Sequence, residues 1–112
     1  MKLYTGYFRK HSRLAKAYSI ARSQPPGIHL PELRDLAPEA SLLRVYKSGE
    51  LSWWDYEARY YRQLTRLGAA YIENLLEDGM TLLCWEKTGK NCHRYVLARF
   101  LRTRGHIVEE RP

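Results

Sequence analysis

Four short segments of the chain have the apolar pattern of β-strands. Leu3–Phe8 is rich in aromatic residues, Ala17–Ala21 is short and apolar, and His106–Glu109 is the last such segment. Met80–Trp85 is almost wholly apolar over the length of one strand, which is typical of a central parallel strand covered on both faces. After the first of these segments, the polar and basic stretch Arg9–Lys16 predicts a loop.

Apolar residues at helical spacing mark four further segments. The first, Glu39–Lys47, follows a proline and ends before Gly49. Ser52 is a favourable N-cap for the second. The core-facing stripe of that second helix consists of Trp53, Tyr56, Tyr60, Leu64 and Leu67. Ala69–Glu77 and Cys92–Arg104 are the remaining predicted helices.

Strands that alternate with helices in this way are typical of α/β proteins with a mainly parallel sheet. A chain of 112 residues forms one domain of ordinary size, so we predict a single domain over residues 1–112. We expect about four strands with helices packed on them, in a Rossmann-like three-layer arrangement whose strand order stays open. No apolar run approaches the length of a membrane span, and Met1–Phe8 lacks the apolar core of a secretory signal.

Positive charge is concentrated at the start of the chain. The sequence has 19 Lys and Arg residues against 12 Asp and Glu residues, a formal net charge of +7. Residues 1–31 contain no acid, and their cations are Lys2, Arg9, Lys10, Arg13, Lys16 and Arg22. A basic segment of this kind attracts polyanions or phosphorylated small molecules. The alternative is a solvated basic surface that keeps the protein soluble.

The segment from Leu82 to Arg94 runs from the predicted buried strand through a polar loop into a helix N-terminus. The first N–H groups of a helix have no partner within the helix, and the helix dipole favours an anion there. Lys87, Lys90, His93 and Arg94 add basic groups around this position. We therefore predict an anion-binding site, the alternative being a helix start that only meets water.

Cys92 lies at the same helix start, where the dipole, His93 and Arg94 favour the thiolate form of its side chain. It is therefore a candidate nucleophile, with His93 or Glu86 as acid or base. The alternative is a half-buried cysteine that packs as a small apolar residue, because the sequence shows no adjacent base with a third, orienting group. Cys84, inside the strand, is expected in the core.

The two cysteines are too few for a disulfide framework, so a reducing cytoplasm is the expected location. A reversible Cys84–Cys92 bridge is conceivable if the two Cα atoms lie within about 7 Å of each other. Cys84, Cys92 and His93 could supply three metal ligands, but their spacing is not that of a recognised zinc site. We therefore predict neither a metal nor a cofactor.

Two motifs lie close together in the second half of the chain: Leu82–Glu86, with the sequence LLCWE, and Cys92–Arg94, with the sequence CHR. Weaker motifs precede them in order: Ile20–Arg22 with Pro25, Leu36–Pro38, Tyr46–Gly49 and Tyr56–Tyr60. Together they resemble the bacterial and archaeal family called domain of unknown function 488, over nearly the whole chain. The sequence departs from that family at Ile20, where an aspartate is usual.

The resemblance implies a cytoplasmic α/β domain with a parallel sheet and no established activity. It also implies that six residues converge at the C-terminal edge of the sheet: Arg22, Cys84, Glu86, Cys92, His93 and Arg94. The chemistry of the individual residues points to the same edge. We therefore assign ligand binding to Arg22, Cys84, Lys87, Lys90 and Arg94, and catalysis to Glu86, Cys92 and His93.

Three functions are consistent with these residues. The first is binding of an anionic ligand, a nucleotide or a nucleic-acid phosphate, at the helix start after strand 80–85. The second is a thiol-dependent or His/Glu-dependent enzyme for a phosphorylated or nucleoside substrate. The third is a non-catalytic module that docks on nucleic acid, provided that the N-terminal cations and Arg59, Arg62 and Arg66 share one face. The expected partner is a nucleotide or nucleic acid, and not a membrane.

Overall fold

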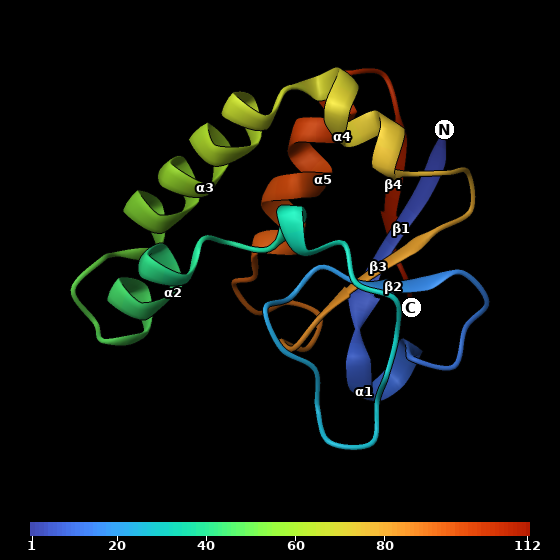
Figure 1. The fold of residues 1–112 in the computed structure, drawn as a ribbon, viewed down its shortest axis with the longest axis horizontal. Coiled ribbons are helices and arrows are strands. Elements are labelled where there is room, and N and C mark those ends of the chain that lie inside the picture. The colour runs from blue at the N-terminus through green and yellow to red at the C-terminus, as the bar shows by residue number, and fades with distance from the viewer.

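A four-stranded parallel sheet forms the centre of the fold (Figure 1). The computed structural model describes residues 1–112, and its strands are β1 (Lys2–Tyr7), β2 (Ala17–Ser19), β3 (Thr81–Cys84) and β4 (Ile107–Glu110). Their order is β2-β3-β1-β4, and each neighbouring pair is parallel. The predicted α/β class and the parallel sheet of four strands are confirmed.

β3 lies inside the sheet, as its apolar sequence predicts. All four of its residues are buried, and it pairs with β2 on one side and with β1 on the other. Leu82 belongs to the main core, whereas Leu83 belongs to a smaller cluster on the opposite face. Because side chains alternate along a strand, Cys84 lies on the same face as Leu82.

Five α-helices and a 3-10 turn connect the strands. They are α1 (Phe8–His11), the turn at Arg34–Leu36, α2 (Ala40–Lys47), α3 (Trp53–Leu67), α4 (Ala69–Leu75) and α5 (His93–Thr103). The four longer helices lie where the apolar spacing predicts them. Ser52 caps α3 as expected, because its Oγ accepts a hydrogen bond from the Asp55 N–H at 3.1 Å. None of the helices combines the length and apolar character needed to cross a bilayer.

The sequence predicts a loop over Arg9–Lys16, but the short helix α1 occupies the start of that segment, so the prediction is wrong for Arg9–His11. Phe8 and His11 are both buried on one side of this turn. The Tyr7 N–H also donates to Nδ1 of His11 at 3.1 Å, which closes the turn directly after β1. Burial against the sheet and this hydrogen bond override the polar, basic character of the local sequence.

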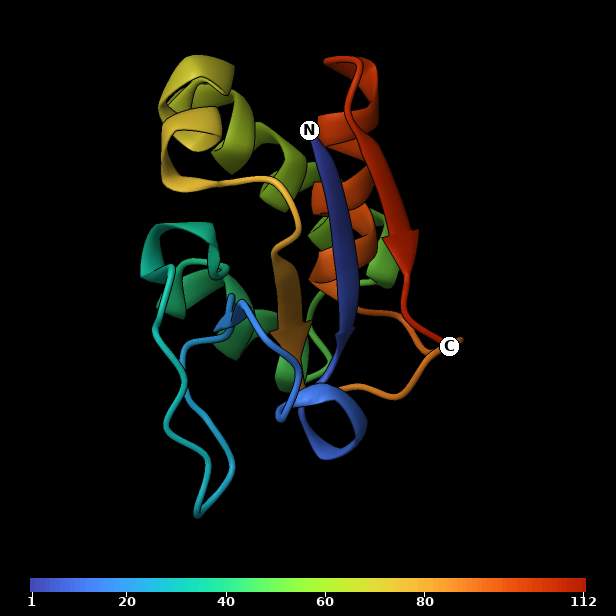
Figure 2. The same ribbon diagram turned by 90° about the vertical axis from the view of Figure 1, so that its right-hand side faces the viewer.

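The sheet is covered on both faces. Tyr60 and Leu64 of α3 and Leu97 of α5 share the main core with Leu82, whereas Phe8, Ile28 and Leu30 pack near Leu83 on the other face. Figure 2 shows the long helices behind the sheet and α1 beyond the end of β1. The arrangement is consistent with a three-layer α/β fold, in which α1 and an irregular segment cover the second face.

Candidate functional site

A pocket opens at the carboxyl ends of β2 and β3, beside the start of α5. Open parallel sheets characteristically bind ligands at this edge. Of the eight residues predicted for the site, five line this pocket: Arg22, Cys84, Glu86, Cys92 and His93. The other three, Lys87, Lys90 and Arg94, do not line it.

Aromatic side chains from α2 and α3 line another part of the pocket. Tyr46 and Tyr56 stack with their ring centroids 4.3 Å apart, and Trp53 lies 5.4 Å from Tyr56. Burial, together with the nearby Glu86 carboxylate, raises the pKa of the Tyr56 phenol, which therefore stays neutral. The helical spacing predicts core positions for Trp53 and Tyr56, and they additionally provide an apolar surface beside the thiols.

His93 is buried and held by a backbone carbonyl. Its Nε2 lies 2.6 Å from the carbonyl oxygen of Ile20, which can only accept, so Nε2 carries the proton and donates. Burial is the main cause that lowers the pKa of His93 to about 4, and the Arg94 charge adds to the effect. The imidazole is therefore neutral at pH 7, and its unprotonated Nδ1 lies 3.9 Å from Sγ of Cys92.

The contact between His93 and Ile20 provides the third, orienting group that the sequence does not show. The base next to Cys92 is His93, and the third, orienting group is the Ile20 carbonyl, 73 residues away along the chain. A backbone carbonyl has no residue-specific signature, so no sequence motif could have identified it. The Cys92 sulfur, the His93 imidazole and the Ile20 carbonyl thus form a chain of sulfur, base and orienting acceptor.

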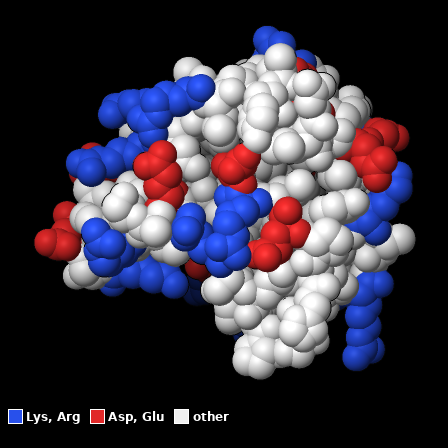
Figure 3. Space-filling model, in the orientation of Figure 1, with Lys and Arg blue, Asp and Glu red and all other residues white.

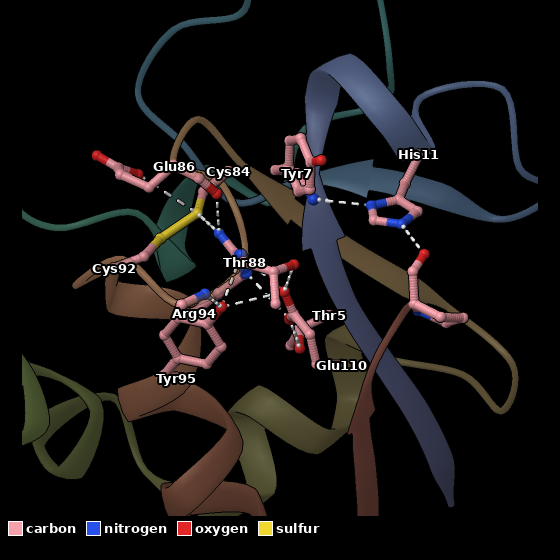
Figure 4. Close-up of polar contacts among 12 residues, drawn as sticks. Thr5, Tyr7, His11, Cys84, Glu86, Thr88, Cys92, Arg94, Tyr95 and Glu110 are labelled. Carbon is pink, nitrogen blue, oxygen red and sulfur yellow. Dashed lines mark hydrogen bonds and ion pairs between the residues drawn. A yellow bond between two sulfur atoms is a disulfide. The ribbon is translucent and has the colours of Figure 1, made fainter.

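Arg94 is completely buried, and all five of its N–H groups donate within the protein (Figure 4). Nε and Nη2 donate to the two carboxylate oxygens of Glu110 at 3.1 and 2.7 Å. Nη1 donates to Sγ of Cys84 at 2.9 Å and to the Glu86 carbonyl at 2.6 Å. Nη2 also donates to the Tyr95 hydroxyl at 2.9 Å. Arg94 has no N–H left for a ligand and instead fixes the groups around Cys84.

Glu110 is the acidic partner of this arrangement. Burial alone would raise the pKa of its carboxyl group, but hydrogen bonds from Arg94, Thr5 and Thr88 outweigh it and lower the pKa to about 2. Glu110 therefore remains charged and compensates the guanidinium. Glu110 is absent from the predicted site, because nothing in a short final strand indicates that its last carboxylate reaches the start of α5.

The two cysteines meet at the pocket and are joined by a disulfide. Their Cα atoms are 7.5 Å apart, slightly beyond the separation expected for a bridged pair. Sγ of Cys84 also lies 3.6 Å from a carboxylate oxygen of Glu86. The possible metal ligands of Cys84, Cys92 and His93 all lie within 4.8 Å of one another, a cluster that the linear spacing does not predict.

Lys87 and Lys90 lie on the exposed loop between β3 and α5. The Lys90 N–H donates to the Lys87 carbonyl at 3.1 Å, which closes a turn there. The cations that line the pocket are instead Arg22, after β2, and Lys47, at the end of α2. Lys47 is absent from the predicted site because its place depends on how α2 packs.

Comparison with known families identifies the chain. The family model DUF488-N3a, described as the active DUF488-N3 subclade, matches residues 10–105. The chain therefore belongs to this DUF488 family, and the resemblance read from the LLCWE and CHR motifs is confirmed. No curated protein and no solved structure matches the chain.

Proposed function

We propose that this protein is a thiol-dependent enzyme that uses Cys92 as its nucleophile and His93 as its proton acceptor. The observation that carries the proposal is the buried, neutral His93, whose Nε2 is fixed by Ile20 while Nδ1 is directed at the Cys92 sulfur. A base that is oriented in this way activates a thiol without a permanent ion pair. The description of the matching subclade as active agrees with this proposal.

The reaction begins from the dithiol form, because a disulfide-bonded sulfur is not a nucleophile. A reducing cytoplasm, the proposed location, would maintain that form. As Cys92 Sγ bonds to the electrophilic atom of the substrate, the S–H bond breaks and its proton passes to Nδ1 of His93. The leaving group departs with its electron pair and takes a proton from His93. Water then attacks the covalent intermediate and gives a proton to Nδ1 of His93. The bond between Sγ and the electrophilic atom breaks, the product leaves, and His93 returns that proton to the Cys92 sulfur.

The other charged groups of the pocket would orient the substrate. Arg22 and Lys47 are suited to an anionic group such as a phosphate. The start of α5 has no side-chain capping bond from Cys92, and a helix N-terminus favours an anion. The proposed substrate is therefore a phosphorylated or nucleoside compound, and Glu86 is a second acid or base. Arg94 is a positioning residue that acts through Cys84 and Glu86.

Alkylation of the reduced protein tests the assignment of the nucleophile. Cys84→Ser leaves only Cys92, and Cys92→Ser leaves only Cys84, so the two variants are matched controls for each other. With iodoacetamide at pH 7 and intact-mass detection, we expect the C84S protein to react at least tenfold faster than the C92S protein. Equal rates, or faster reaction of C92S, would contradict the proposed role of Cys92.

A further inference from the structure

We call the pocket lined by Cys84 and Cys92 the thiol pocket. A second, larger depression adjoins it, and Trp85 lines both. It lies between α1 and the segment Pro25–Leu30, and its volume is about 960 Å³. Its charged side chains are Arg9, Lys10 and Arg13, with His29 on the opposite segment, and no acidic residue lines it. We call this depression the basic groove.

The charges of the basic groove are not neutralised by the protein. Arg9, Lys10 and Arg13 are exposed and form no ion pair. Many other exposed cations do have an acidic partner: Lys2, Lys16, Arg34, Arg66, Arg99 and Arg104. The groove therefore concentrates free positive charge from the acid-free start of the chain, which favours a polyanion.

Trp85 connects the basic groove with the thiol pocket, because its side chain lines both. It is 48% exposed although it directly follows the buried strand β3. Its indole N–H donates to the Ser23 carbonyl at 2.9 Å, and Phe8 packs edge to face against it with the centroids 5.9 Å apart. An exposed aromatic ring held in this way is suited to stacking on a nucleobase.

The thiol pocket itself is small. Its volume is about 70 Å³, which is room for about two water molecules at about 30 Å³ each. The reacting group of a substrate fits this space, but most of a nucleotide must lie on neighbouring surface. The basic groove provides that surface on the other side of Trp85.

We infer that the basic groove binds a single strand of nucleic acid and presents one nucleotide, stacked on Trp85, to the thiol pocket. The inference rests on the proposed function and names its substrate class. Arg9, Lys10 and Arg13 would contact the phosphates. Bases would pack on the apolar side chains of the segment Pro25–Leu30. A single strand is favoured over a duplex because its base faces are free to stack.

The arginines of α3 offer a matched control surface. Arg59, Arg62 and Arg66 line a different groove, against α2, which also contains Glu39. Figure 3 shows Lys and Arg over α2 and α3 on the left and others toward the lower right, with acidic side chains interspersed. The two basic sets line grooves that share no residue, and the inference concerns only the groove beside Trp85.

Fluorescence anisotropy with a labelled 12-nucleotide oligothymidylate at low salt tests the inference on the full chain. Arg9→Ala with Arg13→Ala should weaken binding at least tenfold. It should also lower the magnitude of the log–log salt slope by about 1.4, at about 0.7 for each lost phosphate contact. Arg59→Ala with Arg62→Ala removes the same charge and should change binding less than twofold. Trp85→Ala should weaken binding at least fivefold, as expected for one lost stacking contact.

Several results would overturn the inference. They are absence of binding at low salt, an equal loss in R59A/R62A, or equally tight binding of a duplex of the same length. Binding to phosphatidylserine vesicles that depends on Arg9 and Arg13, without oligonucleotide binding, would indicate a membrane surface instead. Cys92 does not line the basic groove, so the C92S variant should bind the strand like the wild type.

The two proposals can therefore fail separately. Strand binding without a reactive Cys92 thiol would contradict only the proposed function, and a reactive Cys92 thiol without strand binding would contradict only this inference.

Discussion

The ring of Tyr60 meets the imidazole of His93 edge to face, with the centroids 5.4 Å apart. The Tyr60 hydroxyl donates to the Leu36 carbonyl at 2.6 Å, and both residues are fully buried. Burial raises the pKa of the Tyr60 phenol well above its usual value, so the hydroxyl remains a neutral donor. Tyr60 thus links α3 to the segment before α2 and supports the ring of His93.

Tyr60→Phe should therefore destabilise the protein, because it leaves the buried Leu36 carbonyl without its partner. The expected cost is about 1–2 kcal/mol in the free energy of unfolding, measured in urea. The neighbouring half-buried Tyr61 packs on Phe100 but makes no side-chain hydrogen bond through its hydroxyl. Tyr61→Phe is the control and should change stability by less than about 0.5 kcal/mol. Equal effects of the two variants would contradict the stabilising role of the Tyr60 hydroxyl.

Glu110→Gln should destabilise the protein much more than the same change at the adjacent residue. It leaves the fully buried Arg94 guanidinium with an uncompensated charge, at an expected cost of about 3–5 kcal/mol. Glu109 forms an exposed ion pair with Lys2, 3.6 Å apart, so Glu109→Gln should cost less than about 1 kcal/mol. Urea denaturation of both variants checks the difference, and similar midpoints would contradict the account of Arg94.

The stability of the protein should fall as the pH decreases through two windows. His93 has a pKa of about 4 in the folded protein and an ordinary value of 6.5. Between these values the unfolded state binds more protons, so acidification favours unfolding by up to about 3 kcal/mol. Glu110 adds a further loss between its ordinary value of 4.5 and about 2, because its carboxylate is stabilised only in the folded protein.

Denaturant titrations from pH 7 to pH 3 check this dependence. His93→Gln should flatten the upper window, and the Gln side chain can still donate to the Ile20 carbonyl. His29→Gln, a change at an exposed residue of the basic groove, should leave both windows unchanged. A wild-type stability that stays constant between pH 6.5 and pH 4 would show that His93 is not a buried neutral imidazole.

Much of the fold follows from patterns within single segments. The buried strand β3 and the cap of α3 at Ser52 are both local features, and both are present. Helix α1 is missed because its stability depends on where Phe8 and His11 are buried, which a polar local sequence does not show.

The site can be predicted only in part from the sequence, because some of its contacts join segments that are far apart along the chain. Cys92 and His93 are adjacent and lie at a helix start that local patterns identify. The Ile20 carbonyl, just after β2, and Glu110, at the end of β4, reach the site through the strand order β2-β3-β1-β4, which local patterns do not specify. The sequence predicts that Arg94 binds the ligand, but in the structure its guanidinium is buried and pairs with Glu110. Sequence periodicity shows which face of a helix or strand is buried, but it does not show which residues of other segments contact that face.

The proton-acceptor role of His93 is tested most directly by the alkylation rate of Cys92 in its presence and absence. Reduced C84S, C84S/H93Q and C84S/H29Q proteins are compared with iodoacetamide at pH 7, after circular dichroism has shown that all three are folded. We predict that C84S/H93Q reacts at least tenfold more slowly than C84S, while C84S/H29Q reacts at the same rate as C84S. An unchanged rate in C84S/H93Q would contradict the account.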